Sequence, residues 1–228
     1  LTLTGTDATS GMDQMRFSTD GGTNWTAWEA FSLTKSNFSL PTGDGVKTVQ
    51  VQLKDKSGLS SVSFSDSIIL DTVLPTGSID INSGATYTNS TSVTLNLSAT
   101  DDNIDTMSFS TDGINYSTPE IYATSKAFTL PAGDGSKTVS VKYYDKAGNV
   151  SIVYSKAITL DTTVPTGTVK INNDAAYTNS LSITLTLTGT DLTSGLDQMR
   201  FSTDGGTNWT AWEVFSTSKF MTFGSGDG

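Results

Sequence analysis

Aspartates are the residues of this chain whose type and spacing could do chemistry. Asp71 lies in a short connecting segment, whereas Asp101 and Asp102 directly follow a strand-like segment. Carboxylate oxygens are the ligands that calcium prefers, and the ion takes six to eight of them at about 2.3–2.6 Å. The sequence therefore suggests calcium as a structural cofactor, with these candidate ligands: Asp71, Asp101, Asp102, Asp145, Asp161 and Asp191.

A second interpretation gives the same aspartates no metal. Asp side chains often cap turns by accepting hydrogen bonds from nearby backbone N–H groups. The chain also contains no EF-hand loop pattern. On sequence alone, calcium ligation and turn capping both stay open.

Tryptophans are the second candidate for chemistry. Trp25 and Trp28 recur as Trp209 and Trp212. Such rings could form an aromatic platform for sugar binding, or they could pack against the protein itself. A segment between the two pairs has Tyr116 in the corresponding place, which favours packing, because a platform needed throughout would not be replaced.

The composition excludes several classes of site. The chain has no His and no Cys, so it lacks the commonest general base, the commonest transition-metal ligand, disulfides and thiol chemistry. Its net charge of −10 disfavours binding to phosphate backbones, so we expect no nucleic-acid partner. There is no apolar run of about 18 residues, so we expect no membrane span. We also expect that the chain is not an enzyme.

Internal repetition fixes the organisation of the 228 residues. The segment from Gly11 to Glu29 returns almost unchanged from Gly195 to Glu213, and Asp-Thr-x-x-Pro-Thr-Gly occurs at Asp71 and again, 90 residues later, at Asp161. The repeating unit is therefore about 90 residues long. We predict a first copy over residues 1–73 that lacks its start, a complete middle copy over 74–162, and a third copy over 163–228 that lacks its end.

The middle copy reads as about seven short β-strands. Apolar and polar residues alternate from Ser92 to Ala99, which is the period of a half-buried strand. The other predicted strands are Gly77–Ile81, Thr106–Ser110, a segment around Tyr116–Tyr122, Ala127–Leu130, Lys137–Tyr144 and Ser151–Leu160, the last with Ile152, Tyr154, Ile158 and Leu160 facing inward. No segment has a useful helical period. The predicted fold is all-β, a tandem of immunoglobulin-like sandwiches of about 90 residues.

This connectivity brings the aspartates to one end of each sandwich. The second and sixth strands both end at the pole where the first strand starts. Asp101 and Asp102 follow the second strand, Asp145 follows the sixth, and Asp71 lies in the connector that enters there. We expect these four residues to meet at the joint between the first two copies. Asp161 and Asp191 are the corresponding residues at the next joint, and Asp7 and Asp55 those of the first copy.

Four motifs carry a family resemblance: Asp-Thr-x-x-Pro-Thr-Gly, Tyr-Thr-Asn-Ser, Phe-Ser-x-Asp-Gly and Asp-Lys-x-Gly. In this fixed order the chain resembles, over its whole length, the bacterial immunoglobulin-like repeats of very large surface and secreted proteins. The resemblance implies a stalk, spacer or adhesive segment, or an accessory module of a secreted polysaccharide-degrading enzyme. It also implies an extracellular or cell-surface location.

The expected function is therefore structural or adhesive, as part of a long extracellular repeat protein that calcium could stiffen at its joints. The alternative is an array that binds carbohydrate through Trp25, Trp28, Trp209 and Trp212. The expected partners are neighbouring repeats of the same chain and cell-surface or matrix polysaccharide. Self-association into fibres by strand addition is a further expectation.

Overall fold

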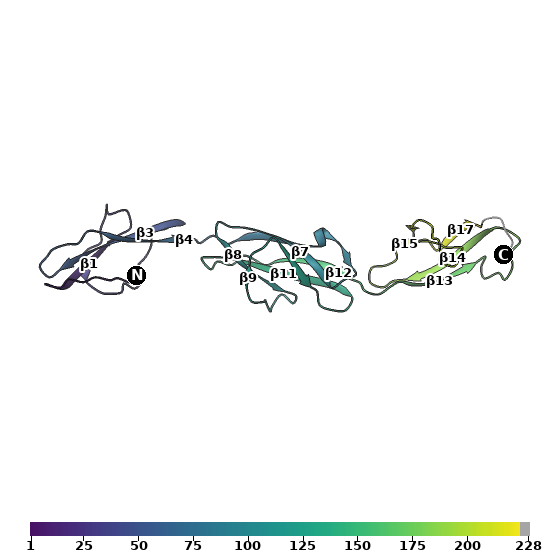
Figure 1. The fold of residues 1–228 in the computed structure, drawn as a ribbon, viewed down its shortest axis with the longest axis horizontal. Coiled ribbons are helices and arrows are strands. Elements are labelled where there is room, and N and C mark those ends of the chain that lie inside the picture. The colour runs from purple at the N-terminus through teal and green to yellow at the C-terminus, as the bar shows by residue number, and fades with distance from the viewer. Residues whose placement is uncertain (224–228) are drawn as a thin grey trace. The chain divides into compact units, whose positions relative to one another are not determined.

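The computed structural model describes residues 1–223, which form β-strands joined by turns and irregular loops (Figure 1). Among them the only helical element is the 3₁₀ turn η1, Asn82–Gly84. The described chain contains no helix that is long and apolar enough to cross a membrane. The predicted all-β class is confirmed.

The described chain forms two compact units. The first contains Leu1–Pro75 together with Asp101–Asp105 and Tyr144–Ser151, and the second contains Thr76–Thr100, Thr106–Tyr143 and the chain from Ile152 onward. Two loops of the middle copy thus belong to the same unit as the first copy. The division into copies at residues 73/74 and 162/163 stays a prediction.

The first copy has one sheet in the order β2-β1-β3-β4. Its strands are β1 (Met12–Ser18), β2 (Glu29–Ala30), β3 (Gly45–Asp55) and β4 (Phe64–Leu70). Met15, Phe17 and Leu53 are buried at the centre of its core. The alternation of apolar residues along β1 and β3 places these side chains on one face of the sheet.

The middle copy has two sheets, in the orders β10-β7-β5 and β6-β12-β11-β8-β9. The strands are β5 (Thr76–Ile81), β6 (Tyr87–Thr88), β7 (Ser92–Thr100), β8 (Ile104–Ser110), β9 (Glu120–Ile121), β10 (Ser125–Thr129), β11 (Gly135–Asp145) and β12 (Tyr154–Leu160). The sheets contact each other through Phe109 on β8 and Phe128 on β10, whose ring centroids are 5.9 Å apart. This arrangement is a β-sandwich.

Alternation along the strands explains the core of this sandwich. On β7 the apolar residues Val93, Leu95 and Leu97 are buried while the residues between them are exposed. Tyr143 on β11 is fully buried, and its hydroxyl donates a 2.6 Å hydrogen bond to the backbone oxygen of Ser78 on β5. The polar atom of the largest core residue therefore has a partner in the opposite sheet.

Three details of the middle copy differ from the prediction. Ile152, expected to face inward, is 67% exposed, because β12 begins only at Tyr154. The strand expected around residues 116–122 is reduced to the two residues of β9. The first strand is followed by a separate short strand, β6, which pairs in parallel with β12.

The third copy has a sheet in the order β13-β14-β17 and a two-stranded sheet of β15 and β16. Its strands are β13 (Thr166–Ile171), β14 (Ser182–Thr190), β15 (Gln198–Met199), β16 (Glu213–Val214) and β17 (Ser218–Thr222). β14 begins 90 residues after β7, at Ser182 against Ser92. Residues 224–228 of the predicted third copy lie outside the described residues.

Candidate functional site

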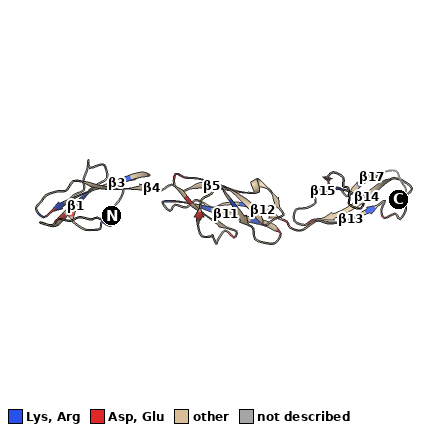
Figure 2. Ribbon diagram, viewed as in Figure 1, with Lys and Arg blue, Asp and Glu red and all other residues tan. Residues whose placement is uncertain are grey.

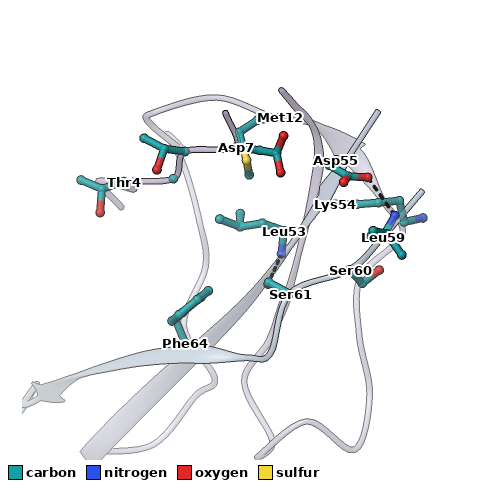
Figure 3. Close-up of a pocket in the computed structure, with 12 residues that line it drawn as sticks. Thr4, Asp7, Met12, Leu53, Lys54, Asp55, Leu59, Ser60, Ser61 and Phe64 are labelled. Atoms are coloured by element: carbon teal, nitrogen blue, oxygen red, sulfur yellow. Dashed lines mark hydrogen bonds between the residues drawn. The ribbon is translucent and has the colours of Figure 1, made fainter. Parts of the chain in front are cut away.

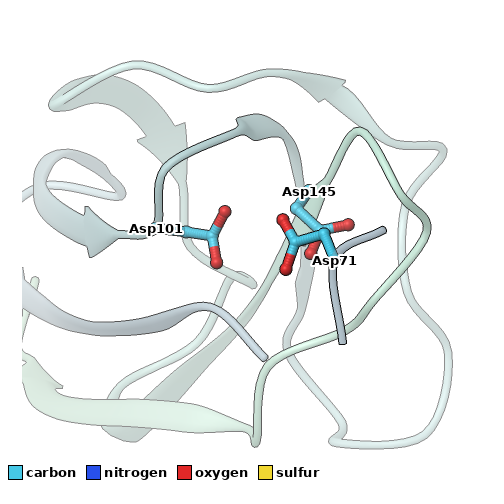
Figure 4. A group of neighbouring side chains, drawn as sticks. All are labelled: Asp71, Asp101 and Asp145. Carbon is cyan, nitrogen blue, oxygen red and sulfur yellow. The ribbon is translucent and has the colours of Figure 1, made fainter. Parts of the chain in front are cut away.

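Three carboxylates come together in the first compact unit (Figure 4). Asp71 follows the last residue of β4, Asp101 follows β7, and Asp145 is the last residue of β11. One oxygen from each lies within 4.8 Å of the others. Asp145 is buried, and the other two are partly exposed. Three formal negative charges thus lie close together at the ends of three strands.

Two asparagines hold these carboxylates in position. Asn103 donates from its side chain to Asp71 Oδ2 at 3.3 Å and from its backbone to Asp101 Oδ1 at 2.8 Å. Asn149 donates from its side chain to Asp145 Oδ2 at 2.7 Å and to the backbone oxygen of Asp71 at 3.0 Å. Each asparagine thus joins Asp71 to one of the other two aspartates.

Asp145 keeps a pKa below its ordinary value despite its burial. Burial has the largest single effect and raises this pKa. The side chain and backbone N–H of Asn149, with the backbone N–H groups of Gly148 and Ala147, donate to the carboxylate and outweigh that effect. The group is therefore a carboxylate at neutral pH, which is the form that binds a cation.

Asp102, expected beside the other three, is outside the group that the described residues form. The Asp101 carboxylate accepts the backbone N–H of Asn103 and so closes a turn. Asp102 is the middle residue of this turn, and its side chain is exposed.

The second unit repeats part of the arrangement at Asp161 and Asp191. The backbone N–H of Ser194 lies 3.0 Å from Asp161 Oδ2 and 2.9 Å from Asp191 Oδ1, so the two carboxylates share one donor. Backbone N–H groups, with that of Ser194 first, hold the pKa of Asp191 below its ordinary value. The predicted pairing of these two aspartates is thus present in the structure, although their role as metal ligands stays a prediction.

In the first copy, Asp7 and Asp55 line one groove beside Leu53 and Met12 (Figure 3). Asp7 Oδ1 accepts the backbone N–H groups of three following residues, at distances from 2.7 to 3.0 Å. Asp55 Oδ1 accepts the backbone N–H of Leu59 at 2.8 Å. Turn capping is therefore present at these aspartates, as the second interpretation expects.

The first pair of tryptophans encloses an arginine. Arg16 Cζ lies 4.9 Å from the ring centroid of Trp25 and 4.5 Å from that of Trp28, and Lys54 Nζ lies 3.9 Å from the Trp28 ring. Arg16 also donates two hydrogen bonds to Gln52 Oε1. A cation within about 6 Å of an indole ring centroid is attracted to the face of the ring. These two rings therefore interact with cationic side chains of their own copy.

The second pair repeats the same stack around Arg200, at 4.9 Å from Trp209 and 4.5 Å from Trp212. Here the rings are 49% and 56% exposed. In the middle copy Lys142 Nζ lies 4.2 Å from the Tyr116 ring. A cation on an aromatic ring is thus the common feature, and it favours the packing interpretation over a free platform.

Sequence reasoning missed the residues that hold these groups together. Asn103, Asn149 and Ser194 connect the aspartates, and Arg16 and Arg200 connect the tryptophans. The arginines could have been found, because each stands in the repeated segment that contains the tryptophans. Nothing in the sequence distinguishes these asparagines from many others.

Comparison with known proteins gives only distant likenesses. No protein-family model matches the chain, and no curated protein matches it. Fibronectin(III)-like modules of Clostridium thermocellum CbhA align with 15% identity and a TM-score of 0.42 over 68% of this chain and 82% of theirs. A tetra-tandem repeat from the extending region of a large adhesion protein aligns with 19% identity and a TM-score of 0.30 over 96% of this chain, which spans 59% of that protein chain.

The strand order and the 90-residue repetition decide the type of fold. The middle copy is a β-sandwich with the strand order of an immunoglobulin-like fold, and its motifs recur along the chain about 90 residues apart. In this fold the loops at each pole carry the residues that vary most freely, while the strands fix their positions. The tandem repeat therefore presents its aspartates where strands end.

Proposed function

We propose that this chain is a structural or adhesive segment of a long extracellular repeat protein. It acts as a stalk or spacer, and calcium binds at Asp71, Asp101 and Asp145. The supporting observation is the convergence of three carboxylate oxygens within 4.8 Å of one another. Neighbouring repeats of the same chain are its first partners.

The spacing of the three oxygens is compatible with calcium. Two ligands on opposite sides of a calcium ion are about 4.6–5.2 Å apart, because each lies at about 2.3–2.6 Å from it. The separations in this group fall within that limit. Backbone and asparagine oxygens from the same loops would complete the six to eight ligands. The chain has 23 Asp and Glu against 13 Lys and Arg, and this net negative charge also attracts a divalent cation. Figure 2 colours the acidic and basic residues along the ribbon.

Isothermal titration of the metal-free chain with calcium tests this proposal. We expect a dissociation constant of about 0.1–1 mM, the range of extracellular calcium modules. At a calcium concentration a hundredfold above this constant, binding to the folded state adds about 2.7 kcal/mol to the free energy of unfolding. If calcium gives no heat of binding and no rise in melting temperature, the proposal is wrong and the aspartates act only as turn caps.

Asp101→Asn and Asp102→Asn form a matched pair for this titration. Both remove one charge from the same turn, but only Asp101 belongs to the three-carboxylate group. We expect Asp101→Asn to weaken calcium binding at least tenfold and Asp102→Asn to leave it nearly unchanged. Equal effects of the two variants would indicate general electrostatic attraction instead of a site.

A second candidate function is binding of polysaccharide at the third copy. Trp212 lines a groove together with Asn89 and Gln198, and its ring is 56% exposed. Asp161, Asp191 and Asp197 line the same groove. An aromatic side chain with a few polar groups beside it is the usual composition of a small-ligand site. Affinity electrophoresis in gels that contain polysaccharide should then show retardation that Trp212→Ala abolishes. Tyr177→Ala, at a 95% exposed aromatic residue, is the control.

A further inference from the structure

Two aspartates outside the proposed metal group hold the segment that leaves each copy. Asp44 Oδ1 accepts the backbone N–H of Thr72 at 3.0 Å and its hydroxyl at 2.9 Å. Asp134 Oδ1 accepts the backbone N–H of Thr162 at 2.8 Å and its hydroxyl at 2.7 Å. We call each of these sets of hydrogen bonds a linker clasp.

The position of each clasp follows from the turn that carries its aspartate. Asp44 directly precedes β3, whose first residue, Gly45, pairs with Leu70 at the end of β4. Asp134 stands in the same relation to β11 and β12. The carboxylate thus continues the hydrogen-bonded ladder beyond its last backbone pair. Gly45 has a φ of 109°, a conformation that favours glycine.

The residue before each threonine is held from the other side. Asp71 accepts hydrogen bonds from Asn103 and Asn149, and Asp161 accepts one from Ser194. In each Asp-Thr pair, therefore, the threonine is bound to the copy that ends and the aspartate to loops of the copy that follows.

Few residues remain free after the clasp. Val73 and Leu74 separate Thr72 from Pro75, whose side chain is fully buried. At the next connector Thr163 also donates to Asp134, which leaves Val164 alone before Pro165. Proline fixes its own φ and restricts the residue before it. The clasp and the proline thus leave two residues between them in the first connector, where the backbone N–H of Val73 also donates to Asp71 Oδ1 at 3.1 Å, and one residue in the second.

We propose that Asp44 and Asp134 are linker-locking residues, which tie the Asp-Thr pair back to the preceding copy and so limit motion at the connectors without any metal. This role does not depend on the proposed calcium site. The clasp consists only of carboxylates, hydroxyls and backbone N–H groups of the chain itself. It predicts ordered connectors in the metal-free protein.

Distance measurements between two spin labels, made with a chelator present to remove calcium, test this role of Asp134. The chain has no Cys, so spin labels at Ile114→Cys and Tyr177→Cys report on the second connector alone. These two side chains are 81% and 95% exposed, so labels there should not disturb the fold. We expect Asp134→Ala to broaden the distance distribution clearly, and Asp102→Ala, the control, to leave it unchanged.

Amide hydrogen exchange gives a local measurement that does not need the labels. Loss of the carboxylate should lower the protection of the Thr162 amide about tenfold, as expected for one hydrogen bond to a charged acceptor. Thr162→Val keeps the hydrogen bond from the backbone N–H to Asp134 and loses only the one from the hydroxyl. Its effects on the distance distribution and on amide protection should therefore be smaller than those of Asp134→Ala. An unchanged distribution together with unchanged protection in Asp134→Ala would overturn the proposal, whatever calcium does.

Discussion

At the residue scale, one turn is built in the same way in all three copies. Asp20, Asp112 and Asp204 each accept a hydrogen bond from a serine hydroxyl two residues earlier and from an asparagine side chain that follows. Backbone and side-chain donation by Asn24 and Asn208 lowers the pKa of Asp20 and of Asp204 to about 2. For Asp112 the side chain of Asn115 is the largest cause, and its pKa is also lowered.

These lowered pKa values predict a loss of stability in acid. A carboxylate whose pKa is lower in the folded than in the unfolded state stabilises the fold above about pH 4, and this contribution disappears as the pH falls toward 2. Melting temperatures measured from pH 5 to pH 2 should therefore fall. The fall should be smaller in an Asp20→Asn, Asp204→Asn double variant. An identical fall in that variant would show that these turns do not contribute.

A second prediction concerns the buried hydroxyl of Tyr143. Burial, the largest cause, raises the pKa of this group, and its hydroxyl donates to the Ser78 backbone oxygen. Tyr143→Phe leaves that oxygen without this donor and should lower the free energy of unfolding by about 1 kcal/mol. Urea denaturation checks this, with Tyr87→Phe at a 51% exposed site as the control. Equal midpoints for the two variants would contradict it.

At the scale of elements, β5 depends on a close approach between the two sheets of the middle copy. A Cβ atom at Gly77 would overlap the Ser98 backbone oxygen and lie 2.6 Å from the ring of Tyr143. Only glycine leaves room for β5 to pair with β7 and lie against this ring. The second residue of β13, Gly167, has the same tight contact with Thr188.

Gly77→Ala should therefore destabilise the middle copy by about 1–3 kcal/mol, the usual cost of overpacking. The neighbouring variant Ser78→Ala, at an exposed side chain of the same strand, should change stability little. Denaturant unfolding, monitored by Tyr fluorescence, measures the stability of both variants. A Gly77→Ala variant as stable as Ser78→Ala would mean that β5 can shift away without cost.

Alternation made the strands predictable, while their ends were less so. Val93, Leu95 and Leu97 were expected inward and are buried, because a strand of period two has a single apolar face. Ile152 was misplaced because the chain between the Asp145 turn and Tyr154 is irregular, and alternation holds only within a strand. The convergence of Asp71, Asp101 and Asp145 followed from connectivity, but the asparagine donors depend on side-chain geometry that no local pattern encodes.

At the scale of the whole molecule, burial is uneven among the copies. The middle copy contains most of the buried apolar residues, whereas the first has Met15, Phe17 and Leu53, and the described part of the third has Ile183 and Leu185. Hydrophobic burial is the main stabilising contribution to folding. The copies should therefore not unfold together.

Limited proteolysis of the 228-residue chain should show this order. We expect cleavage first within the third copy, then within the first, with a fragment close to residues 74–162 surviving longest. Thermal unfolding should accordingly have more than one transition, so that a single melting temperature does not describe it. A single cooperative transition with simultaneous loss of all three copies would contradict this expectation.

Asp71 is contacted by side chains that lie 32 and 78 residues further along the chain. The short motif that ends the first copy thus offers two acceptors to the loops of the middle copy, its aspartate carboxylate and its backbone oxygen. At the next connector the same motif again places its aspartate within reach of a loop that follows, where the donor is the backbone N–H of Ser194. One acceptor position in the motif can therefore be used by different donors.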